Sequence, residues 1–280
     1  MEGIIKAVCI SEKRGTVKKN INEVNVIKDF GLERDAHAGK WHRQVSFLSA
    51  DIVDEFNEKG ASVIEGDFGE NILAYGIDFK KLPVGTKLIC NDAKFEITQI
   101  GKECHSHCEI YKRVGDCIMP REGIFAKVLE SGTIKVGDKI EVIYPEKDMP
   151  YMAAVMTLSD KGSRGERVDT SGPRAAEILK EHGFKIVEEL LLPDEKAQIK
   201  KHLIRLSDSR QVDLIITTGG TGLSPRDRTP EATLAVADRN VPGISEAIRA
   251  GSMTITKRAM LSRGVSVIRK KTLIINLPGS

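Results

Sequence analysis

The feature that most constrains the fold is a single change of pattern at Tyr144–Pro150, YPEKDMP, which carries two prolines and three charged residues between two apolar runs. A segment of this composition is typical of a linker or a domain edge. A chain of 280 residues is expected to form about two domains, each large enough to bury its own core. We therefore expect one domain over residues 1–146 and a second over residues 151–280.

The first part is rich in short segments of β-branched and aromatic residues, separated by turn signals such as Pro83-Val-Gly. These segments are Ile4–Ile10, Val45–Leu48, Lys87–Cys90, Phe95–Ile100 and Lys139–Ile143. One helix is predicted over residues 50–59, with Ser49 as its N-cap and Gly60 at its end. The pattern predicts a β-rich barrel or sandwich with few helices.

The second part alternates between predicted strands and predicted helices. The strands are Met152–Leu158, Ile186–Leu192, Val212–Thr217 and Thr272–Leu277. Ser171 is predicted to cap a helix that has Pro173 in its first turn and stops at Gly183, and Asp194 is placed to cap the next helix. This alternation predicts an α/β three-layer domain with a mostly parallel sheet, whose ligands bind at the carboxyl ends of the strands.

Three polar loops follow these strands, at residues 157–173, 217–233 and 276–280. Glycines at 219, 220 and 222 let backbone N–H groups approach an anion, and a helix that opens at Thr229-Pro230 adds a favourable dipole. A P-loop is excluded because no Gly-Lys-Ser/Thr follows the glycines, and GGTGLS lacks the dinucleotide-binding spacing. The loops predict a phosphate-binding site at one edge of the sheet.

The motifs of these loops carry a family resemblance. LSDKGSRGERVDTSGP, LLPDE, TTGGTGLSPRDRTPEAT, the AMLSR segment at Ala259–Arg263 and NLPGS are similar to those of the molybdopterin adenylyltransferase family, over residues 151–280. The resemblance implies a trimeric α/β domain that uses Mg-ATP and transfers AMP to the molybdopterin phosphate, releasing pyrophosphate. Because family members continue past NLPGS, we expect the domain to be truncated at Ser280.

The catalytic aspartates of that family fall on Asp194 and Asp227. A carboxylate on a glycine-bearing loop is suited to hold Mg²⁺ between phosphate oxygens, which we expect of Asp227. Asp194 also has an alternative interpretation as a helix N-cap, and the two roles can coexist. The resemblance implies that ATP or molybdopterin is bound by Ser159, Asp160, Gly219, Gly220, Thr221, Gly222, Arg226, Thr229, Asn276, Pro278 and Gly279. Arg226 and Arg228 are interpreted as phosphate or pterin contacts, the alternative being solvated loop charges.

The cysteines all lie in the first part: Cys9, Cys90, Cys104, Cys108 and Cys117. An odd number without an export signal argues against a disulfide framework. The C-x₃-C spacing of Cys104 and Cys108, flanked by histidines, allows structural zinc, although the spacing is unusual. We prefer a thiolate that carries sulfur or binds molybdenum, with Cys104 first and Cys108 and Cys117 in reserve. The alternative is a set of reduced, partly buried thiols.

A basic loop, Gly31–Leu48, gathers cations around the only tryptophan, Trp41. Its candidate cofactor-binding residues are Arg34, His37, His42 and Arg43, with Lys40 nearby. A basic loop with an aromatic side chain can cradle a phosphorylated planar heterocycle, and the alternative is an exposed charged loop. Downstream, EGDFGENI adds Asn71 as a hydrogen-bonding group for a pterin.

These segments, with the cysteine region and residues 119–142, resemble the MOSC domain family over roughly residues 3–145. The family is related to the C-terminal part of molybdenum cofactor sulfurases. The resemblance implies a β-barrel that binds molybdenum cofactor or carries sulfur through a cysteine. The two resemblances are independent of each other and indicate the same cofactor.

We therefore expect a cytoplasmic enzyme of molybdenum cofactor biosynthesis that uses Mg²⁺, ATP and molybdopterin, with no pyridoxal phosphate. Expected partners are further copies in a homotrimer, a molybdate-insertion enzyme and molybdoenzymes. Lys+Arg 43 against Asp+Glu 40 gives a net charge of +3, too balanced for a nucleic-acid-coating protein, and no apolar run reaches the ~18 residues of a membrane span. The alternatives are a non-catalytic binding or storage protein, and an α/β domain that acts on another nucleotide.

Overall fold

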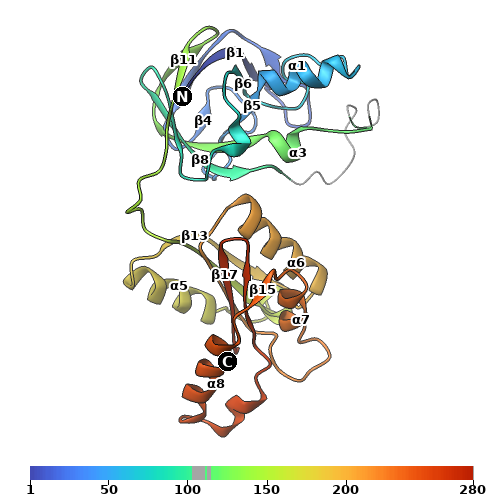
Figure 1. Cartoon of the computed structure of the whole chain (residues 1–280), viewed down its shortest axis with the longest axis vertical. Helices are drawn as coiled ribbons and strands as arrows, with labels where there is room; N and C mark the ends of the chain where they lie inside the picture. Colours follow the sequence, from blue (N-terminus) through green and yellow to red (C-terminus); the bar gives the residue numbers. More distant parts are fainter. Residues whose placement is uncertain (103–110, 112–114, 280) are drawn as a thin grey trace. The chain divides into compact units, whose positions relative to one another are not determined.

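The computed structural model describes residues 1–102, 111 and 115–279. The chain forms two compact units, Met1–Lys147 and Asp148–Ser280, which divide within the proline-bearing stretch 144–150 (Figure 1). Among the described residues, no helix is long and apolar enough to cross a membrane.

The N-terminal unit is built on a closed barrel of seven strands. Around the barrel they run β1 (Glu2–Ile10), β11 (Lys139–Ile143), β7 (Lys87–Cys90), β8 (Ala93–Ile100), β9 (Ile124–Glu130), β5 (Val45–Ser49) and β6 (Ile72–Tyr75), and β6 pairs with β1 again. Only the β5–β6 pairing is parallel among these. Closure leaves the barrel strands without a free edge. The segments predicted as strands therefore form a barrel and not a sandwich.

Smaller elements cover the barrel. They are the short strand β2 (Lys19–Asn20), a sheet of β10 (Gly132–Lys135), β3 (Glu23–Ile27) and β4 (Gly31–Leu32), the helices α1 (Ala50–Glu58) and α3 (Met119–Glu122), and the 3₁₀ turn η1 (Phe79–Lys81). The core holds three fully buried aromatic rings, with Phe47 lying 5.2 Å from Phe95 and 5.6 Å from Phe79 between ring centroids. Such tilted and edge-on packing is favoured by the ring quadrupoles.

The C-terminal unit has a six-stranded sheet in the order β13 (Lys185–Leu192), β12 (Met152–Leu158), β14 (Leu214–Thr218), β17 (Thr272–Leu277), β16 (Ser266–Arg269) and β15 (Arg239–Asn240). The first four strands are parallel to one another, whereas β16 pairs antiparallel with both β17 and β15. This is the mostly parallel sheet that the sequence predicts. β14 is buried along its whole length, as its apolar run indicates.

Helices lie on both faces of this sheet, so the unit has three layers. They are α4 (Asp160–Ser163), α5 (Ser171–Glu181), α6 (Lys196–Ile204) with the π turn η2 (Arg205–Ser209), α7 (Thr229–Leu234), α8 (Pro242–Met253) and the 3₁₀ turn η3 (Lys257–Leu261). Successive residues of β12 face opposite sides of the sheet. Ala153 packs in the apolar cluster that contains Leu179 of α5, and Ala154 packs in the cluster that contains Ile199 of α6.

Two predicted helix caps are wrong. Ser171 lies inside α5, and the carboxylate of Asp169 instead accepts hydrogen bonds from the amides of Ser171 and Gly172, at 3.0 and 3.1 Å. Asp194 precedes α6 but does not cap it, because Glu195 occupies the N-cap position and makes no side-chain cap bond. The Asp194 carboxylate is directed to a different helix, as described below.

Candidate functional site

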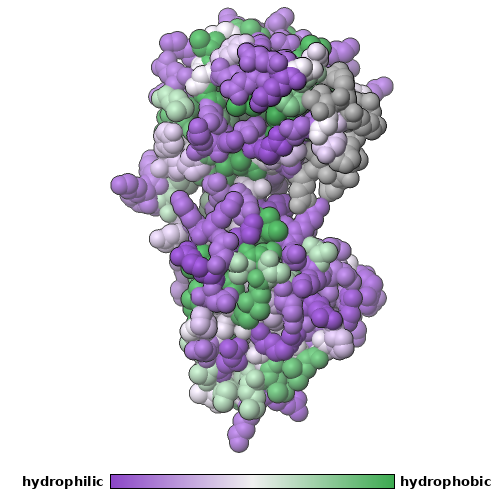
Figure 2. Space-filling view, turned by 45° about the vertical axis from the view of Figure 1, so that its right-hand side comes forward, coloured by the Kyte–Doolittle hydropathy of each residue, from purple (hydrophilic) through white to green (hydrophobic). Residues whose placement is uncertain are grey.

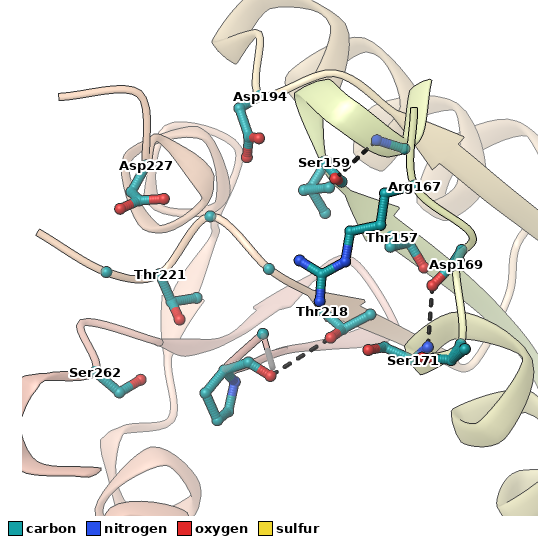
Figure 3. Close-up of a pocket in the computed structure, with 18 of the residues that line it drawn as sticks. Thr157, Ser159, Arg167, Asp169, Ser171, Asp194, Thr218, Thr221, Asp227 and Ser262 are labelled. Carbon is teal, nitrogen blue, oxygen red and sulfur yellow. Dashed lines mark hydrogen bonds between the residues drawn. The ribbon is translucent and has the colours of Figure 1, made fainter. Parts of the chain in front are cut away.

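An open cavity of about 670 Å³ lies at the carboxyl ends of the parallel strands of the C-terminal unit (Figure 3). β12, β14 and β17 are adjacent and parallel, so the loops that follow them meet at one edge of the sheet. The predicted site residues that line the cavity are Ser159, Asp194, Gly219, Gly220, Thr221, Gly222, Asp227, Pro278 and Gly279. Residues from all three predicted loops are thus brought together.

The segment 219–228, here called the glycine loop, presents unpaired backbone amides. Among the described residues, nothing accepts a hydrogen bond from the N–H groups of residues 220–223. Gly219 and Gly220 have φ angles of +96° and +63°, a conformation that glycine adopts without strain. Successive free amides in such a turn form a concave anion-binding surface. The glycine loop therefore has a geometry suited to an anion, and phosphate binding there stays a prediction.

The helix dipole expected at Thr229 does not contribute to this surface. α7 is only six residues long, and the first amide of the helix, that of Thr229, donates to the Gly220 carbonyl at 3.2 Å. Thr229 itself is fully buried and does not line the cavity. Thr229 thus lies beneath the glycine loop, and its contact with ligand stays a prediction.

Asp194 is linked to Asp160 by two reciprocal hydrogen bonds. Asp194 Oδ2 accepts from the Asp160 amide at 3.2 Å, and Asp160 Oδ1 accepts from the Asp194 amide at 3.0 Å. The other oxygen of Asp194, Oδ1, is buried and has no hydrogen-bond partner. Burial raises the pKa of Asp194 above its ordinary value, and the negative charges of Asp160 and Asp227 raise it further. A buried carboxylate oxygen without a partner is suited to receive a cation or a proton donor.

Arg226 supports this pair from outside the cavity. Its guanidinium binds both carboxylate oxygens of Asp160, at 2.8 and 2.9 Å, and its third nitrogen donates to Glu195 at 2.9 Å. The hydrogen bonds from Arg226 hold the pKa of Asp160 below its ordinary value. Neither Arg226 nor Asp160 lines the cavity. Arg226 and Asp160 thus hold Asp194 in place, and the phosphate or pterin contact of Arg226 stays a prediction.

Asp227 faces the cavity from the glycine loop. Its Oδ2 accepts from the Ser224 amide at 2.9 Å, and its own amide donates to the Ser224 carbonyl at 2.9 Å. Figure 3 shows the carboxylates of Asp194 and Asp227 both turned toward the space above the glycine loop. Within the described part of the chain, no three His, Cys, Asp or Glu residues are grouped to hold a metal. Three aspartates line the cavity: Asp169, Asp194 and Asp227. Asp169 accepts from the Ser171 and Gly172 amides, which leaves Asp194 and Asp227 as the candidate ligands for a cation.

Two cavity-lining cations, Arg167 and Arg258, were missed by sequence reasoning. Arg167 belongs to the first predicted loop, and Figure 3 shows its side chain extending into the cavity. The motif that contains Arg167 was recognised, but its spacing gives no sign of which side chain points inward. Arg258 lies in η3, outside all three predicted loops, and no local pattern connects it to the site.

Asn276 is also placed differently from the expectation. It is 2% exposed, and its Nδ2 donates to Thr217 and Thr233 side chains at 2.9 and 3.0 Å, while its Oδ1 accepts from the Val265 amide. All of its hydrogen-bonding groups are used within the protein. Asn276 therefore fixes β17 against its neighbours, and its contact with ligand stays a prediction.

In the N-terminal unit, the basic loop is anchored by a buried ion pair that sequence reasoning missed. Lys18 Nζ lies 2.7 Å from Asp35 Oδ2, and both side chains are almost fully buried. Asp35 also accepts from the Ser11 amide and from Asn71 Nδ2. Burial alone would raise the pKa of Asp35, but Lys18 and these donors bring it below its ordinary value. Lys18 stands outside the basic motif, so only the fold brings the two together.

Asn71 belongs to this anchor and not to a pterin contact. Its Nδ2 donates to Cys9 O and Asp35, and its Oδ1 accepts from the amide and hydroxyl of Ser46. At 2% exposure it has no surface to offer a ligand. In this structure Asn71 positions Asp35 beneath the loop, and its contact with a pterin stays a prediction.

The remaining basic-loop residues lie at or near the surface. The Arg43 guanidinium lies 4.6 Å from the centre of the Trp41 ring, and Trp41 Nε1 donates to His37 O at 3.1 Å. His42 pairs with Gln99 at 3.0 Å. Arg34 is exposed, with a φ of +61°. The loop thus presents an arginine stacked on an aromatic ring, the arrangement expected of a site for a planar anion.

The cysteines divide into two groups. Cys104, Cys108, His105 and His107 lie outside the described residues. Cys9, Cys90 and Cys117 are buried. Burial raises the pKa of the Cys9 and Cys90 thiols to about 12. Because the thiolate is the reactive form, Cys9 and Cys90 are inert core residues.

The fold and the site define an α/β unit with a cavity at the carboxyl ends of parallel strands, joined in one chain to a β-barrel. Residues 154–280 match the family described as a probable molybdopterin binding domain, and residues 34–141 match the MOSC domain. The chain belongs, through its C-terminal unit, to the molybdopterin adenylyltransferase family.

The similarity to curated relatives covers slightly less than half of this chain. The chain is 43% identical over 127 residues to the molybdopterin adenylyltransferase of Helicobacter pylori J99, covering 45% of this chain and 72% of the relative. It is 45% identical over 128 residues to that of Escherichia coli K12, covering 45% of this chain and 65% of the relative. A solved structure, the molybdopterin biosynthesis enzyme MoaB from Thermus thermophilus, is 49% identical, with 46% of this chain and 82% of that chain covered and a TM-score of 0.45.

Proposed function

We propose that the C-terminal unit transfers AMP from ATP to the phosphate of molybdopterin. The observation that carries this proposal is that one cavity is lined by Gly220, Thr221 and Gly222, whose amides no described residue engages, and by the carboxylates of Asp194 and Asp227. Amides that bind phosphate oxygens, opposite carboxylates that bind a cation, supply the charge neutralisation that nucleotidyl transfer needs. The named activity of the relatives supports the same reaction.

The proposed reaction requires little proton transfer by the protein. A phosphate oxygen of molybdopterin attacks the α-phosphorus of ATP, a new P–O bond forms, and the bond to the bridging oxygen breaks so that pyrophosphate leaves with the electron pair. A phosphate monoester has a second pKa of about 6, so the attacking oxygen is already ionised at neutral pH. The protein's residues bind and align the two phosphates and exclude competing orientations.

Magnesium fits the residues present. Asp194 has a buried oxygen without a partner, and Asp227 uses only one of its two oxygens for Ser224. One or two carboxylates together with substrate phosphates form the usual protein site for Mg²⁺. Asp194 and Asp227 would hold the ion, which when bound would neutralise charge on the phosphates.

The test is chromatographic detection of adenylylated molybdopterin after incubation of the protein with molybdopterin and Mg-ATP, beside Asp227→Asn. Product from the wild type and almost none from the variant supports the proposal. Tight molybdopterin binding without any ATP turnover by the wild type would instead establish the non-catalytic binding or storage function. A panel of other acceptor nucleotides in the same assay tests for an α/β domain of different specificity.

For the N-terminal unit we propose binding of the maturing molybdenum cofactor at the basic loop, with Cys104 as the thiol that holds molybdenum or carries sulfur. The stacked Arg43 and Trp41 pair supports a planar anionic ligand. Titration of molybdenum cofactor into the wild type, Arg43→Gln and Cys104→Ser tests both parts. Weaker binding by Arg43→Gln is expected, and unchanged sulfur and molybdenum content in Cys104→Ser would contradict the role of the cysteine.

We further propose that the chain forms a homotrimer through its C-terminal unit, and that a molybdate-insertion enzyme and molybdoenzymes receive its product. Figure 2 shows apolar side chains on the surface of this unit. Its exposed large apolar residues include Leu223, Met253, Ile255, Met260 and Leu261. Such groups are typical of an interaction surface. Light scattering should give a mass three times 30.8 kDa, and a Met260→Asp variant should reduce it.

A further inference from the structure

Arg263 holds the glycine loop from behind. The residue lies between η3 and β16, and its side chain is half-buried. Its backbone amide donates to Thr221 O at 2.9 Å, its Nε donates to Gly222 O at 2.6 Å, and its Nη2 donates to Asp227 O at 2.6 Å. The remaining nitrogen, Nη1, pairs with the carboxylate of Glu231 in α7. One residue therefore binds three carbonyls of the loop and ties the loop to the following helix.

These contacts determine the direction of the loop amides. In a trans peptide the N–H group points opposite to the carbonyl of the same peptide unit. Three consecutive carbonyls are engaged within the protein: Gly220 O by the Thr229 amide, and Thr221 O and Gly222 O by Arg263. The N–H groups of the same three units belong to Thr221, Gly222 and Leu223. They are turned away from these partners and are among the amides that no described residue engages.

The positive charge of the guanidinium group also makes the loop amides stronger hydrogen-bond donors. A hydrogen bond from a charged donor to a carbonyl is stronger than one between neutral groups, and it polarises the peptide so that its N–H becomes a better donor. Nε of Arg263 acts in this way on the unit whose N–H belongs to Leu223. Arginine suits the position because its planar fork reaches two carbonyls and a carboxylate at once, which lysine cannot do.

We propose that Arg263 is a positioning residue that presents the amides of Gly222 and Leu223 to the phosphate oxygens of the nucleotide substrate. The inference rests on the proposed function for the identity of the phosphate, but its geometry concerns any phosphate anion in the cavity. Arg263 does not touch the anion and acts through the loop.

The test uses the full chain, labelled with ¹⁵N, and pyrophosphate as the probe. In the wild type, pyrophosphate should shift the amide resonances of Gly222 and Leu223 in a saturable way. Arg263→Gln should weaken pyrophosphate binding by about tenfold or more, because the amides lose their orientation, and Arg263→Lys should fall between the two. The matched control is Arg269→Gln, which removes a comparably placed arginine that binds Asp208 and Val236 O away from the loop.

Two results would overturn the proposal: pyrophosphate that binds the wild type without moving the Gly222 and Leu223 resonances, or an Arg263→Gln variant that binds it as tightly with the same shifts. If Arg263→Gln does not fold, Arg263→Lys decides by the same criterion. A wild type that shows the amide shifts but makes no adenylylated product would refute the proposed function and leave the role of Arg263 intact.

Discussion

Asp160 and Asp194 each accept a hydrogen bond from the other's backbone amide, at 3.0 and 3.2 Å. Asp160 follows β12 and Asp194 follows β13, so the exchange ties together the ends of two parallel strands. Two carboxylates this close disfavour each other's ionisation, and Arg226 offsets this by pairing with Asp160. The relationship fixes the position of Asp194 and also adjusts its charge.

Asp227→Asn should lower kcat/KM for adenylyl transfer by about 10²–10³-fold, the usual effect of removing one charge-stabilising group. The asparagine oxygen can still accept from the Ser224 amide, so the melting temperature should change little. The matched control is Asp238→Asn, whose carboxylate likewise accepts one backbone amide, from Lys270 at 2.6 Å, and lies outside the cavity. Equal losses in both variants would contradict the assigned role.

The acid limb of the pH–rate profile should follow Asp194, whose raised pKa places its ionisation above the ordinary range. If the carboxylate form is active, activity falls as pH falls through that pKa. Arg226→Gln removes a nearby positive charge and should move the limb to higher pH. Asp160→Asn removes a negative charge but keeps the backbone donor, so it should move the limb to lower pH. Steady-state rates between about pH 4 and 8 test this, and shifts in the same direction would refute it.

The raised pKa of Asp194 also makes the stability of the folded protein depend on pH. Because folding raises the pKa, this group favours the folded state most below its unfolded pKa, and that contribution is lost as pH rises through the folded value. Activity and this stability contribution therefore change in opposite directions with pH.

Gly220→Ala should damage both stability and activity. The glycine has a φ of +63°, and an added Cβ would lie 2.2 Å from Thr229 Oγ1 and 2.7 Å from Asp194 Oδ1. Gly183→Ala is the control, because Gly183 has a φ of +84° with nothing within 4 Å of the added atom. Chemical denaturation should show a cost of about 1–2 kcal/mol for the control from its backbone alone, and a larger one for Gly220→Ala. Equal costs would mean that the Asp194 contact is relieved without strain.

Lys18→Met should destabilise the N-terminal unit by about 3–5 kcal/mol, because it leaves the buried Asp35 without its counterion. Adding Asp35→Asn should recover part of this loss, since the two changes act on one interaction. The lowered pKa of Asp35 means that its contribution is present above its unfolded pKa and is lost as pH falls through the folded value. Urea denaturation at neutral and at low pH measures both, and strictly additive losses would show that the residues are not coupled.

Local sequence pattern predicted many of the strands and helices. It also predicted that the candidate site lies at the carboxyl ends of the parallel strands. The apolar runs over Met152–Leu158 and Thr272–Leu277 match β12 and β17 at both ends. Because parallel strands end at one edge, the loops behind them had to meet there. In the first part the same reasoning found five of the seven barrel strands, did not include β6 and β9, and left barrel and sandwich open. Barrel closure depends on the pairing of β1 with β11, near the two ends of that unit.

The direction of individual side chains was beyond local pattern. Asp194 and Ser171 stand where a cap is common, yet the helices begin elsewhere and the carboxylates of Asp194 and Asp169 bind other amides. Asn276 sits in a glycine- and proline-bearing motif typical of a ligand loop, yet it faces inward because Thr217 and Thr233 lie beneath it.

The sequence by itself determined that this protein has a β-rich part and a mostly parallel α/β part, and it predicted a phosphate-binding site at the loops of the second. These are properties of short segments, set by periodicity, glycine and turn residues. Only the tertiary structure decided which groups face the ligand and which hold them. Arg226 binds Asp160, 66 residues away in the sequence, and Arg263 binds Gly222, 41 residues away. Each contact depends on how the chain packs, so the local sequence around either residue does not predict it.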